Sequence, residues 1–364
     1  MVVADSEVTG RRESGSPGGH LLDRAGTLIH DPTRTDVEAS LRSGRFFWLN
    51  LARVSDEELG WMREVFGFHP LAIDDAVTFG ERPKIEEYDD HILLVMYGSA
   101  FDDGIGERGP PSPGSKPDAS PAILPENLDD VLEVHCYVSA NFLVTVHRGS
   151  CAAFTKLAAR LCEHGVAVDH PARLFHRVAD ILVDSFFPVL SKLDDRIDQV
   201  ESDIIERPDR SQMGELLHFR HSLIGLRRVV TPQRDMFASL AGGVVEFPGL
   251  DDEAQRYYRD VYDHLIRLSD LIDGYRDLLS GATDAYLSVT SNQLNVVMKQ
   301  LAIISTVFLP LSFLTGFFGQ NFTFLTSNIG SWETFWFAGV GSEVLVVVSM
   351  MALFRARGWL GRAG

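Results

Sequence analysis

A stripe of small, polar and aliphatic side chains along the most apolar stretch of the chain is the first candidate for chemistry. Its members follow one another at steps of three and four, which places them on one side of a helix: Asn295, Met298, Leu301, Ser305, Leu309, Ser312 and Gly316. A divalent cation that gives up its water reluctantly suits neutral amide, hydroxyl and carbonyl oxygens, with leucine rings acting as dewetting gates. Small residues also let two membrane helices pack closely, so the stripe alone leaves both interpretations open.

The stripe ends at a turn made of Gly319, Gln320 and Asn321. A glycine and an asparagine at a helix end are ordinary C-terminal caps, because both tolerate the backbone conformations that end a helix. Their carbonyl and amide oxygens could also meet an ion. By themselves, these residues favour the cap.

An acidic residue, Glu343, lies well inside a second apolar segment. A carboxyl group is costly in a bilayer, and an intramembrane acid is by default a candidate functional group. It is either a protonated or hydrogen-bonded residue that faces the neighbouring helix, or a group that carries protons or binds a second cation. The sequence leaves its role open.

Two apolar segments hold these residues. The first, 300–322, has no charged side chain, and the second is 335–354; each is long enough to cross about 30 Å of hydrocarbon as a helix. The connecting loop has no lysine or arginine, whereas Lys299 precedes the first segment and three arginines follow the second. We expect a multi-pass protein of the inner (plasma) membrane, for which the positive-inside rule predicts cytoplasmic N- and C-termini. We expect spans at 301–319 and 335–354, an extracellular loop at 320–334 and a basic cytoplasmic tail at 355–364.

The composition limits the classes of function. The 364 residues carry a formal net charge of -18, which argues against nucleic acid as a partner and is compatible with divalent cations, although a solvated acidic surface gives the same balance. The three cysteines, Cys136, Cys151 and Cys162, have no metal-binding or disulfide spacing. Because there is no glycine-rich phosphate loop, metal-binding histidine cluster or nucleophile arrangement, we expect no enzymatic activity and no cofactor.

The segment before the spans is predicted to be a cytosolic domain of mixed α/β class. Residues 1–44 are rich in glycine, serine, arginine and aspartate, so we expect a disordered N-terminal tail. Strand and helix periods alternate across 45–170, which contains a proline- and glycine-rich loop at 102–128. A helical hairpin is expected at 171–250. Kinks or interruptions are expected near its prolines, Pro188 and Pro232.

A long stalk helix at 251–300 is predicted to continue into the first span. Apolar residues step alternately by four and three from Val261 to Val289, which is a heptad seam, and the next proline is Pro310. The seam suggests that copies of the chain pack side by side. Any conducting role also requires an oligomer, because a single two-span hairpin cannot enclose an aqueous path.

Several separated motifs occur in a fixed order along the chain. They are PLAIDD at 70–75, RPKIEEYDD at 82–90, RDVYDH at 259–264, a span containing Pro310 that ends in a G-x-N-F turn, and a basic C-terminal end with Trp359. Together they resemble the CorA family of magnesium channels, over roughly residues 45–362. The resemblance implies a homopentamer with a funnel-shaped cytosolic domain, a stalk helix and a C-terminal two-helix transmembrane hairpin.

The resemblance also implies roles for particular residues. The family's extracellular G-M-N signature, its selectivity filter, stands here as Gly-Gln-Asn at 319–321. All residues of the stripe except Ser305 match pore-facing positions. Asp260 and Asp102 match an acidic pair that binds regulatory Mg²⁺ between subunits. Two such carboxylates repel each other when bare and attract when a divalent ion lies between them, so high cytosolic Mg²⁺ would hold a closed state.

The function that the resemblance implies is influx of Mg²⁺, and also of Co²⁺, through a pore lined by the first span of an oligomer and gated by cytosolic Mg²⁺. One alternative is a proton-coupled transporter of Zn²⁺ or another transition metal, since Gln320 and Glu343 depart from the family pattern. The other alternative is a non-conducting, membrane-anchored sensor or scaffold.

Overall fold

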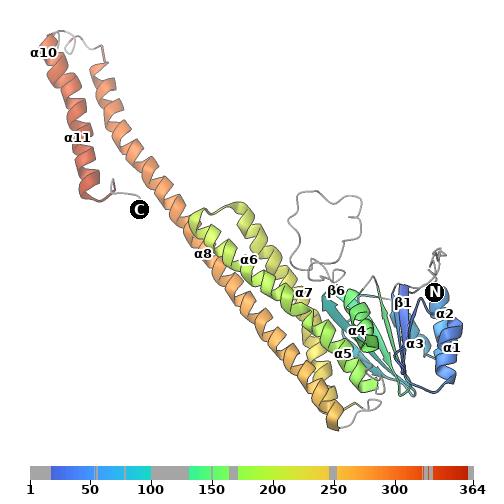
Figure 1. The fold of residues 1–364 in the computed structure, drawn as a ribbon. Helices are drawn as coiled ribbons and strands as arrows, with labels where there is room; N and C mark the ends of the chain where they lie inside the picture. Colours follow the sequence, from blue (N-terminus) through green and yellow to red (C-terminus); the bar gives the residue numbers. More distant parts are fainter. Residues whose placement is uncertain are drawn as a thin grey trace, which may run out of the picture. The chain divides into compact units, whose positions relative to one another are not determined.

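The computed structural model describes most of the chain (Figure 1). The described residues are 18–52, 54, 56–77, 79–99, 131–148, 151–163, 171–245, 252–321, 323, 327 and 331–359. They divide into two compact units, one made of 1–202 and 209–283 and the other of 203–208 and 284–364. The loop predicted at 102–128 and the first 17 residues lie outside the described residues.

A mixed sheet is the centre of the first unit. Its strands are β1 (Gly18–Asp23), β2 (Leu28–His30), β3 (Phe47–Ala52), β4 (Lys84–Glu87), β5 (Ile92–Ser99), β6 (Val131–Val138) and β7 (Phe142–His147). Within the described ranges they form seven strands in the order β2-β1-β3-β7-β6-β5-β4. β3 and β7 are parallel, with Leu49 opposite Val144. β6 and β7 form an antiparallel hairpin, and Ser139 N donates to Phe142 O across its turn (2.9 Å).

Part of the predicted disordered tail is ordered, which corrects the expectation for 1–44. Residues 18–44 contribute β1, β2 and α1 (Arg34–Arg42), and β1 pairs with β3 along its whole length. Two leucines of β1 and Val37 of α1 are completely buried. A few well-spaced apolar side chains therefore anchor a segment whose average composition is polar.

A capping box starts α1. Thr33 N donates to Asp36 Oδ2 (2.8 Å), and Asp36 N donates to Thr33 Oγ1 (3.4 Å). The hydroxyl and amide of Thr33 lower the pKa of Asp36, because they hydrogen-bond to the ionised carboxylate. This reciprocal pair satisfies backbone groups that have no partner within the first turn of the helix.

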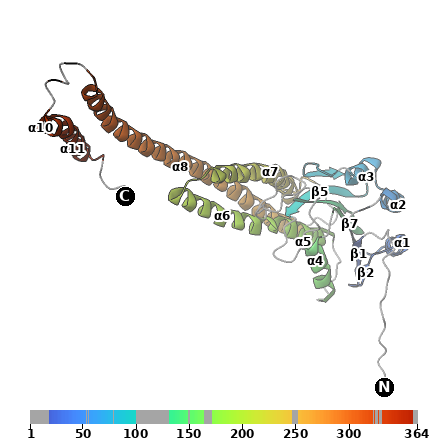
Figure 2. The ribbon, with the colours of Figure 1, turned by 90° about the horizontal axis from the view of Figure 1, so that it is seen from above.

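Helices cover both faces of the sheet (Figure 2). α1, α2 (Asp56–Phe66) and α3 (Pro70–Val77) lie on one face, and α4 (Ala152–Glu163) and α5 (Pro171–Asp184) lie on the other. Successive side chains of a strand point to opposite faces. Accordingly, the odd-numbered apolar residues of β3 join the core with α1–α3, whereas Trp48 packs edge to face on Phe154 of α4.

The sheet and α5 approach each other closely at Gly98 of β5. A Cβ at this position would lie 2.9 Å from Leu182 Cδ2 and 3.0 Å from Leu182 O, so glycine permits an approach that any side chain would push apart. Ser185, just after α5, accepts a hydrogen bond from Ser99 N through its Oγ (2.6 Å). These contacts at the end of β5 therefore set the position of α5.

The predicted helical hairpin is present, and its first helix is divided. α5 ends at Asp184 and α6 (Phe186–Glu206) begins two residues later. The break lies just before Pro188, which cannot donate the helical hydrogen bond to residue 184 and whose ring clashes with that carbonyl. α7 (Arg210–Ala241) continues without interruption through Pro232.

The long helix α8 (Asp252–Phe318) is continuous, but its heptad seam does not join copies of the chain in its first part. The seam residues from Val261 to Ala282 are all buried within a single chain. The neighbouring Tyr258 shows what covers this side of α8, because its hydroxyl donates to Ala172 O (3.2 Å) and its ring packs on Phe175 and Phe237. The seam up to Ala282 is therefore an intrachain helix-packing surface, which corrects the expected side-by-side stalk.

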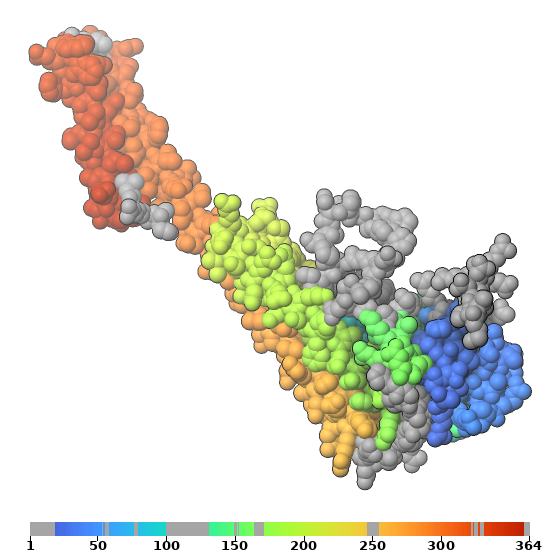
Figure 3. Space-filling view, viewed as in Figure 1, coloured from blue at the N-terminus to red at the C-terminus, as the bar shows by residue number. Residues whose placement is uncertain are grey.

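The second unit, as described, contains the end of α8, α10 (Trp332–Thr334), a π-helix η2 (Phe335–Val340) and α11 (Gly341–Ala356). Two helical segments, Gln255–Phe318 and Trp332–Ala356, are long and apolar enough to cross a membrane. Their most apolar windows are almost completely unburied, and these segments are orange and red in Figure 3. Such surfaces need a cover of lipid or of other chains.

Candidate functional site

The predicted stripe lies on one side of α8 and is uncovered in the single chain. All seven of its residues are exposed, among them Leu301 at 63% and Leu309 at 76%. At about 100° per residue, the half-buried positions of the span lie roughly opposite. They are Ile303, Val307, Pro310, Leu311, Leu314 and Phe318. The side that carries the small and polar groups is thus available to an ion path or to another copy of the chain.

The turn at the end of this helix brings its first residue close to α8. Gly319 N donates to Thr315 O (2.9 Å), and Gln320 N donates to Phe317 O (3.3 Å). A Cβ on Gly319 would lie 3.1 Å from Thr315 O, so glycine permits this approach. Gln320 and Asn321 are exposed. The turn works as a helix cap, and it also leaves both amide side chains accessible.

Glu343, the intramembrane acid, faces the first span. Its Oε1 lies 2.9 Å from Thr315 Oγ1. Of the two interpretations of this residue, the structure shows the contact with the neighbouring helix. Thr315 lies beside the stripe and next to Gly316 in the sequence.

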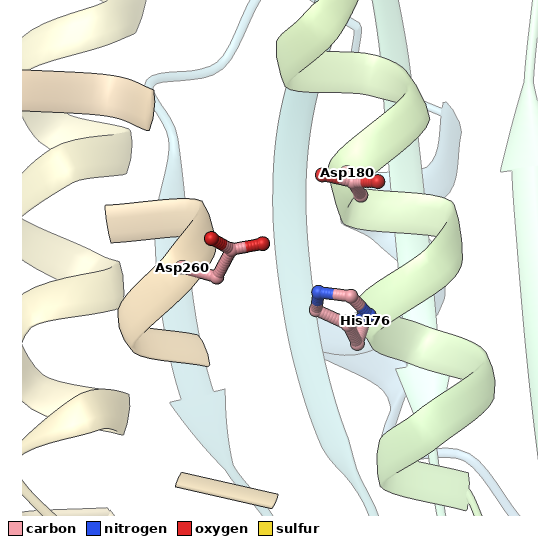
Figure 4. A group of neighbouring side chains, drawn as sticks. All are labelled: His176, Asp180 and Asp260. Carbon is pink, nitrogen blue, oxygen red and sulfur yellow. The ribbon is translucent and has the colours of Figure 1, made fainter. Parts of the chain in front are cut away.

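A cluster of carboxyl and imidazole groups lies between α5 and α8 (Figure 4). His176, Asp180 and Asp184 are spaced by four along α5, so they share one side of that helix. Asp260 and His264 are spaced in the same way along α8. In each of two triads, one ligand atom per residue lies within 4.8 Å of the others: His176, Asp180 and Asp260, and Asp180, Asp184 and His264.

The electrostatics of this cluster favour a bound cation. Burial and the charge of Asp180 raise the pKa of Asp184, while His264 Nδ1 lies 2.9 Å from Asp184 Oδ1. Burial lowers the pKa of His176, so its ring is neutral at pH 7. Asp180 Oδ1 and His176 Nε2 are both buried without a hydrogen-bond partner among the described residues. Carboxylate oxygens suit Mg²⁺, and an imidazole nitrogen suits a transition metal.

The cluster differs from the predicted regulatory pair. Asp260 is in it, but Asp102 lies outside the described residues, so their pairing stays a prediction. The sequence interpretation missed His176, Asp180, Asp184 and His264. The usable signal was the spacing by four of histidine and aspartate on two predicted helices.

A comparison with protein-family models decides which family this fold and these residues represent. The family described as CorA-like Mg²⁺ transporter protein matches residues 43–112 and 117–356. The chain belongs to this CorA-like family. The resemblance seen in the motifs is therefore confirmed.

Known relatives of this CorA-like chain include transporters of different metals. It is 29% identical over 330 residues to the cobalt/magnesium transport protein CorA of Thermotoga maritima, covering 90% of this chain and 88% of that protein. It is 23% identical over 333 residues to the zinc transport protein ZntB of Yersinia pseudotuberculosis, covering 91% of each. The complete structure of the CorA magnesium transporter from Methanocaldococcus jannaschii matches with a TM-score of 0.71 at 21% identity, covering 87% of this chain and 92% of that chain.

These comparisons confirm the predicted fold class: a soluble α/β domain, a long helix and two C-terminal apolar helices. The protein is a CorA-family transporter of divalent metal ions and a membrane protein. Its family is one of transporters and not a known enzyme class.

Proposed function

We propose that this CorA-like chain forms a homo-oligomeric channel that admits Mg²⁺ across the plasma membrane. The observation that carries the proposal is the exposed, uncharged stripe on the span of α8, which leads to the turn Gly319, Gln320 and Asn321. In the proposal, the stripe lines the path and the turn is the outer selectivity filter. The N- and C-termini lie in the cytoplasm, because basic residues that flank membrane spans favour the cytoplasmic side.

The chemistry of the stripe supports a hydrated Mg²⁺ ion as the substrate. Its polar atoms are an amide, two hydroxyls and backbone carbonyls, which contact a hydration shell without stripping it. It contains no histidine or cysteine, and its one soft ligand for transition metals is the thioether of Met298. Leu301 and Leu309 form apolar rings in an oligomer, and such rings close a pore by dewetting.

An oligomer is needed because one chain exposes the stripe completely and encloses nothing. Exposed apolar residues also continue towards the membrane on the part of α8 after Thr283, including Leu287, Leu294 and Val297. The family resemblance implies five copies. Copies arranged about a common axis would bury both the stripe and these apolar residues of α8.

The cluster between α5 and α8 supports regulation by the transported ion. A cation bound by Asp180 and Asp260 links the two helices and relieves the repulsion among their carboxylates. High cytosolic Mg²⁺ would therefore stabilise one arrangement of these helices, the closed state, and depletion would release it. Asp102 of a neighbouring copy remains the predicted further ligand.

A proton-coupled Zn²⁺ transporter is the second candidate. It is favoured by the similarity to ZntB over 91% of the chain, by two histidines in the cluster and by Glu343 within the second span. It differs from the first proposal in the ion carried and in its need for a pH gradient.

Flux into liposomes that contain the full-length protein tests these alternatives. We expect Mg²⁺ entry without a pH gradient, a loss of at least about tenfold in Asn321→Ala, the size of effect that removing one key polar ligand gives, and no change in Gln300→Ala. Gln300 is an exposed amide residue of α8 that lies roughly opposite the stripe at about 100° per residue, so it is a matched control. Zn²⁺ entry that collapses without a pH gradient would support the second candidate. No flux of any divalent ion would support the non-conducting sensor or scaffold, and full activity of Asn321→Ala would contradict the filter.

A further inference from the structure

Glu343 and Thr315 connect the two membrane helices close to the proposed filter. Glu343 is the third residue of α11, and its Oε1 lies 2.9 Å from Thr315 Oγ1 on α8. The same Oγ1 lies 2.9 Å from Leu311 O, one turn earlier on α8. Both helical segments belong to the second compact unit. The threonine oxygen therefore has two oxygen neighbours at hydrogen-bonding distance.

The number of hydrogens at this contact indicates the protonation state of Glu343. A threonine hydroxyl has one hydrogen, which makes one strong bond. If Glu343 is ionised, the hydroxyl hydrogen of Thr315 can bond either to Leu311 O or to the carboxylate. In either case, Thr315 Oγ1 lies 2.9 Å from the remaining oxygen with no hydrogen between them. With a neutral Glu343, the acid donates to Thr315 Oγ1 and Thr315 donates to Leu311 O. The neutral acid satisfies both contacts, and it is the form that an apolar environment disfavours least.

Along the described parts of the two membrane helices, no basic residue lies near Glu343 in the sequence. In the described part of the span, α8 has no titratable side chain from Gln300 to Phe318. On the returning segment, the nearest charged residues along the chain are Glu333 in α10 and Arg355 near the end of α11. Both lie more than two helical turns from Glu343 along the sequence, at about 3.6 residues per turn.

Thr315 connects Glu343 with the proposed filter turn. Its carbonyl oxygen accepts the hydrogen bond of Gly319 N (2.9 Å). Its neighbour Gly316 belongs to the exposed stripe. A displacement of Thr315 would therefore move the first residue of the turn and the last residue of the stripe.

An irregular helix places Glu343 at this point. The π-helix η2 ends at Val340, and the N–H of the next residue, Gly341, donates to Trp336 O, five residues earlier. A Cβ on Gly341 would lie 3.2 Å from that oxygen, so glycine suits the wider turn. A π-turn changes the rotation of the residues on either side of it, and such turns are frequent at functional sites. Here the turn lies two residues before the acid.

We propose that Glu343 is a positioning residue of the ion path, which acts as a neutral acid that holds Thr315 and, through it, the turn from Gly319 to Asn321. This inference rests on the proposed function, since the turn is a filter only in a channel. Glu343 neither carries protons nor binds the transported ion. Its hydrogen bond to Thr315 fixes the position of the filter turn along the axis of α8, relative to the stripe.

Four variants in liposome flux assays test the proposal. Glu343→Gln keeps a neutral donor and should retain Mg²⁺ flux within about twofold of the unmodified protein. Glu343→Leu and Thr315→Val should each lower the flux about fivefold, the factor expected from one interhelical hydrogen bond. The double variant Glu343→Leu/Thr315→Val should show no further loss, because both changes remove the same contact.

Thr306→Val is the matched control for Thr315→Val. The Thr306 hydroxyl also donates to a carbonyl one turn earlier, Ala302 O (2.7 Å), but it has no carboxyl neighbour among the described residues. We expect unchanged flux for this variant. Size-exclusion chromatography would verify that each variant assembles as the unmodified protein does.

Two results would overturn the proposal. One is a Glu343→Gln variant that is as impaired as Glu343→Leu. The other is flux that depends on a proton gradient in the unmodified protein and loses that dependence in Glu343→Gln. If the unmodified protein carries no ion, the proposed function fails instead, and infrared difference spectra still test the neutral acid that this inference requires: a protonated-carboxyl band that disappears in Glu343→Gln supports a neutral Glu343, and the absence of such a band refutes the inference.

Discussion

Replacing Asp180 with asparagine should abolish the stabilisation of this protein by Mg²⁺. Asp180 is the member shared by both triads of the cluster between α5 and α8. The substitution keeps the size of the side chain and removes its charge. A neutral amide is a weaker ligand for a hard cation than a carboxylate is. The remaining carboxylates of the cluster also repel each other less, so a bound cation relieves less repulsion.

The size of the effect follows from mass action. A cation that binds only the folded state stabilises it by about 2.7 kcal/mol at a concentration a hundred times the dissociation constant. At about 2–4 °C per kcal/mol for a domain of this size, the unfolding midpoint of the unmodified protein should rise by about 5–11 °C. In Asp180→Asn the rise should be about 1 °C or less. Without Mg²⁺, the variant should be at least as stable as the unmodified protein.

The pH dependence has a definite sign. The raised pKa of Asp184 means that its contribution to stability is complete below its ordinary value of 3.8 and is lost as the pH rises through the raised value. The lowered pKa of His176 means that its contribution is present above 6.5 and is lost as the pH falls through the lowered value. A cation needs an ionised Asp184 and a neutral His176. The rise in midpoint with Mg²⁺ should therefore be larger at about pH 7.5 than at about pH 5.

The assay is thermal unfolding of the full-length protein in detergent, with and without Mg²⁺ at equal ionic strength. Asp277→Asn is the matched control, because Asp277 is an exposed aspartate of α8 outside the cluster. If Mg²⁺ raised the midpoints of all three proteins equally, it would act by screening the net charge of -18 and the cluster would not be a cation site.

Three further outcomes are expected. Lys84 Nζ lies 2.7 Å from Asp75, 2.6 Å from Glu81 and 3.0 Å from Glu86. Lys84→Met leaves these three carboxylates without their shared cation, so it should lower the free energy of unfolding by about 1–3 kcal/mol. The measurement is a lower Tm. Thr33→Val should cost about 1 kcal/mol in a denaturant titration through loss of the helix cap. Since the pKa of Asp36 is lowered from 3.8, the stability that it contributes is present above that value and lost as the pH falls below it. Leu309→Asn should increase Mg²⁺ flux into liposomes at high internal Mg²⁺, because an amide wets the apolar ring; unchanged closure would contradict a gate at this residue.

The membrane segments and most strands could be predicted from the sequence, because their signals are local. An uninterrupted apolar run sets the end of the first span, and α8 ends at Phe318, one residue before the predicted boundary. The runs around Leu49, Leu94 and Val144 became buried strands. The ordered part of the N-terminal tail was missed, since its three anchoring residues are few among many polar ones.

The meeting of the two carboxyl and imidazole triads and the packing of the seam could not be predicted, because they depend on how separate helices pack against each other. A heptad pattern is the same whether its partner is another copy or another helix of the same chain. Only the packed structure shows that Asp260 faces Asp180, which lies 80 residues earlier in the sequence. The proposed filter is recognisable only through the family resemblance, since Gly319 and Asn321 look like ordinary cap residues.

The close approach at Gly98 links the sheet to the helix that carries three residues of the cluster. A methyl group there would lie 2.9 Å from Leu182 Cδ2 and 3.0 Å from Leu182 O, so Leu182 would have to shift by a few tenths of an ångström. Leu182 lies on α5 between Asp180 and Asp184, which form one of the two triads with His264 of α8. In the proposed cation site, a strand residue with no polar side chain would in this way influence the spacing of the ligands from a distance.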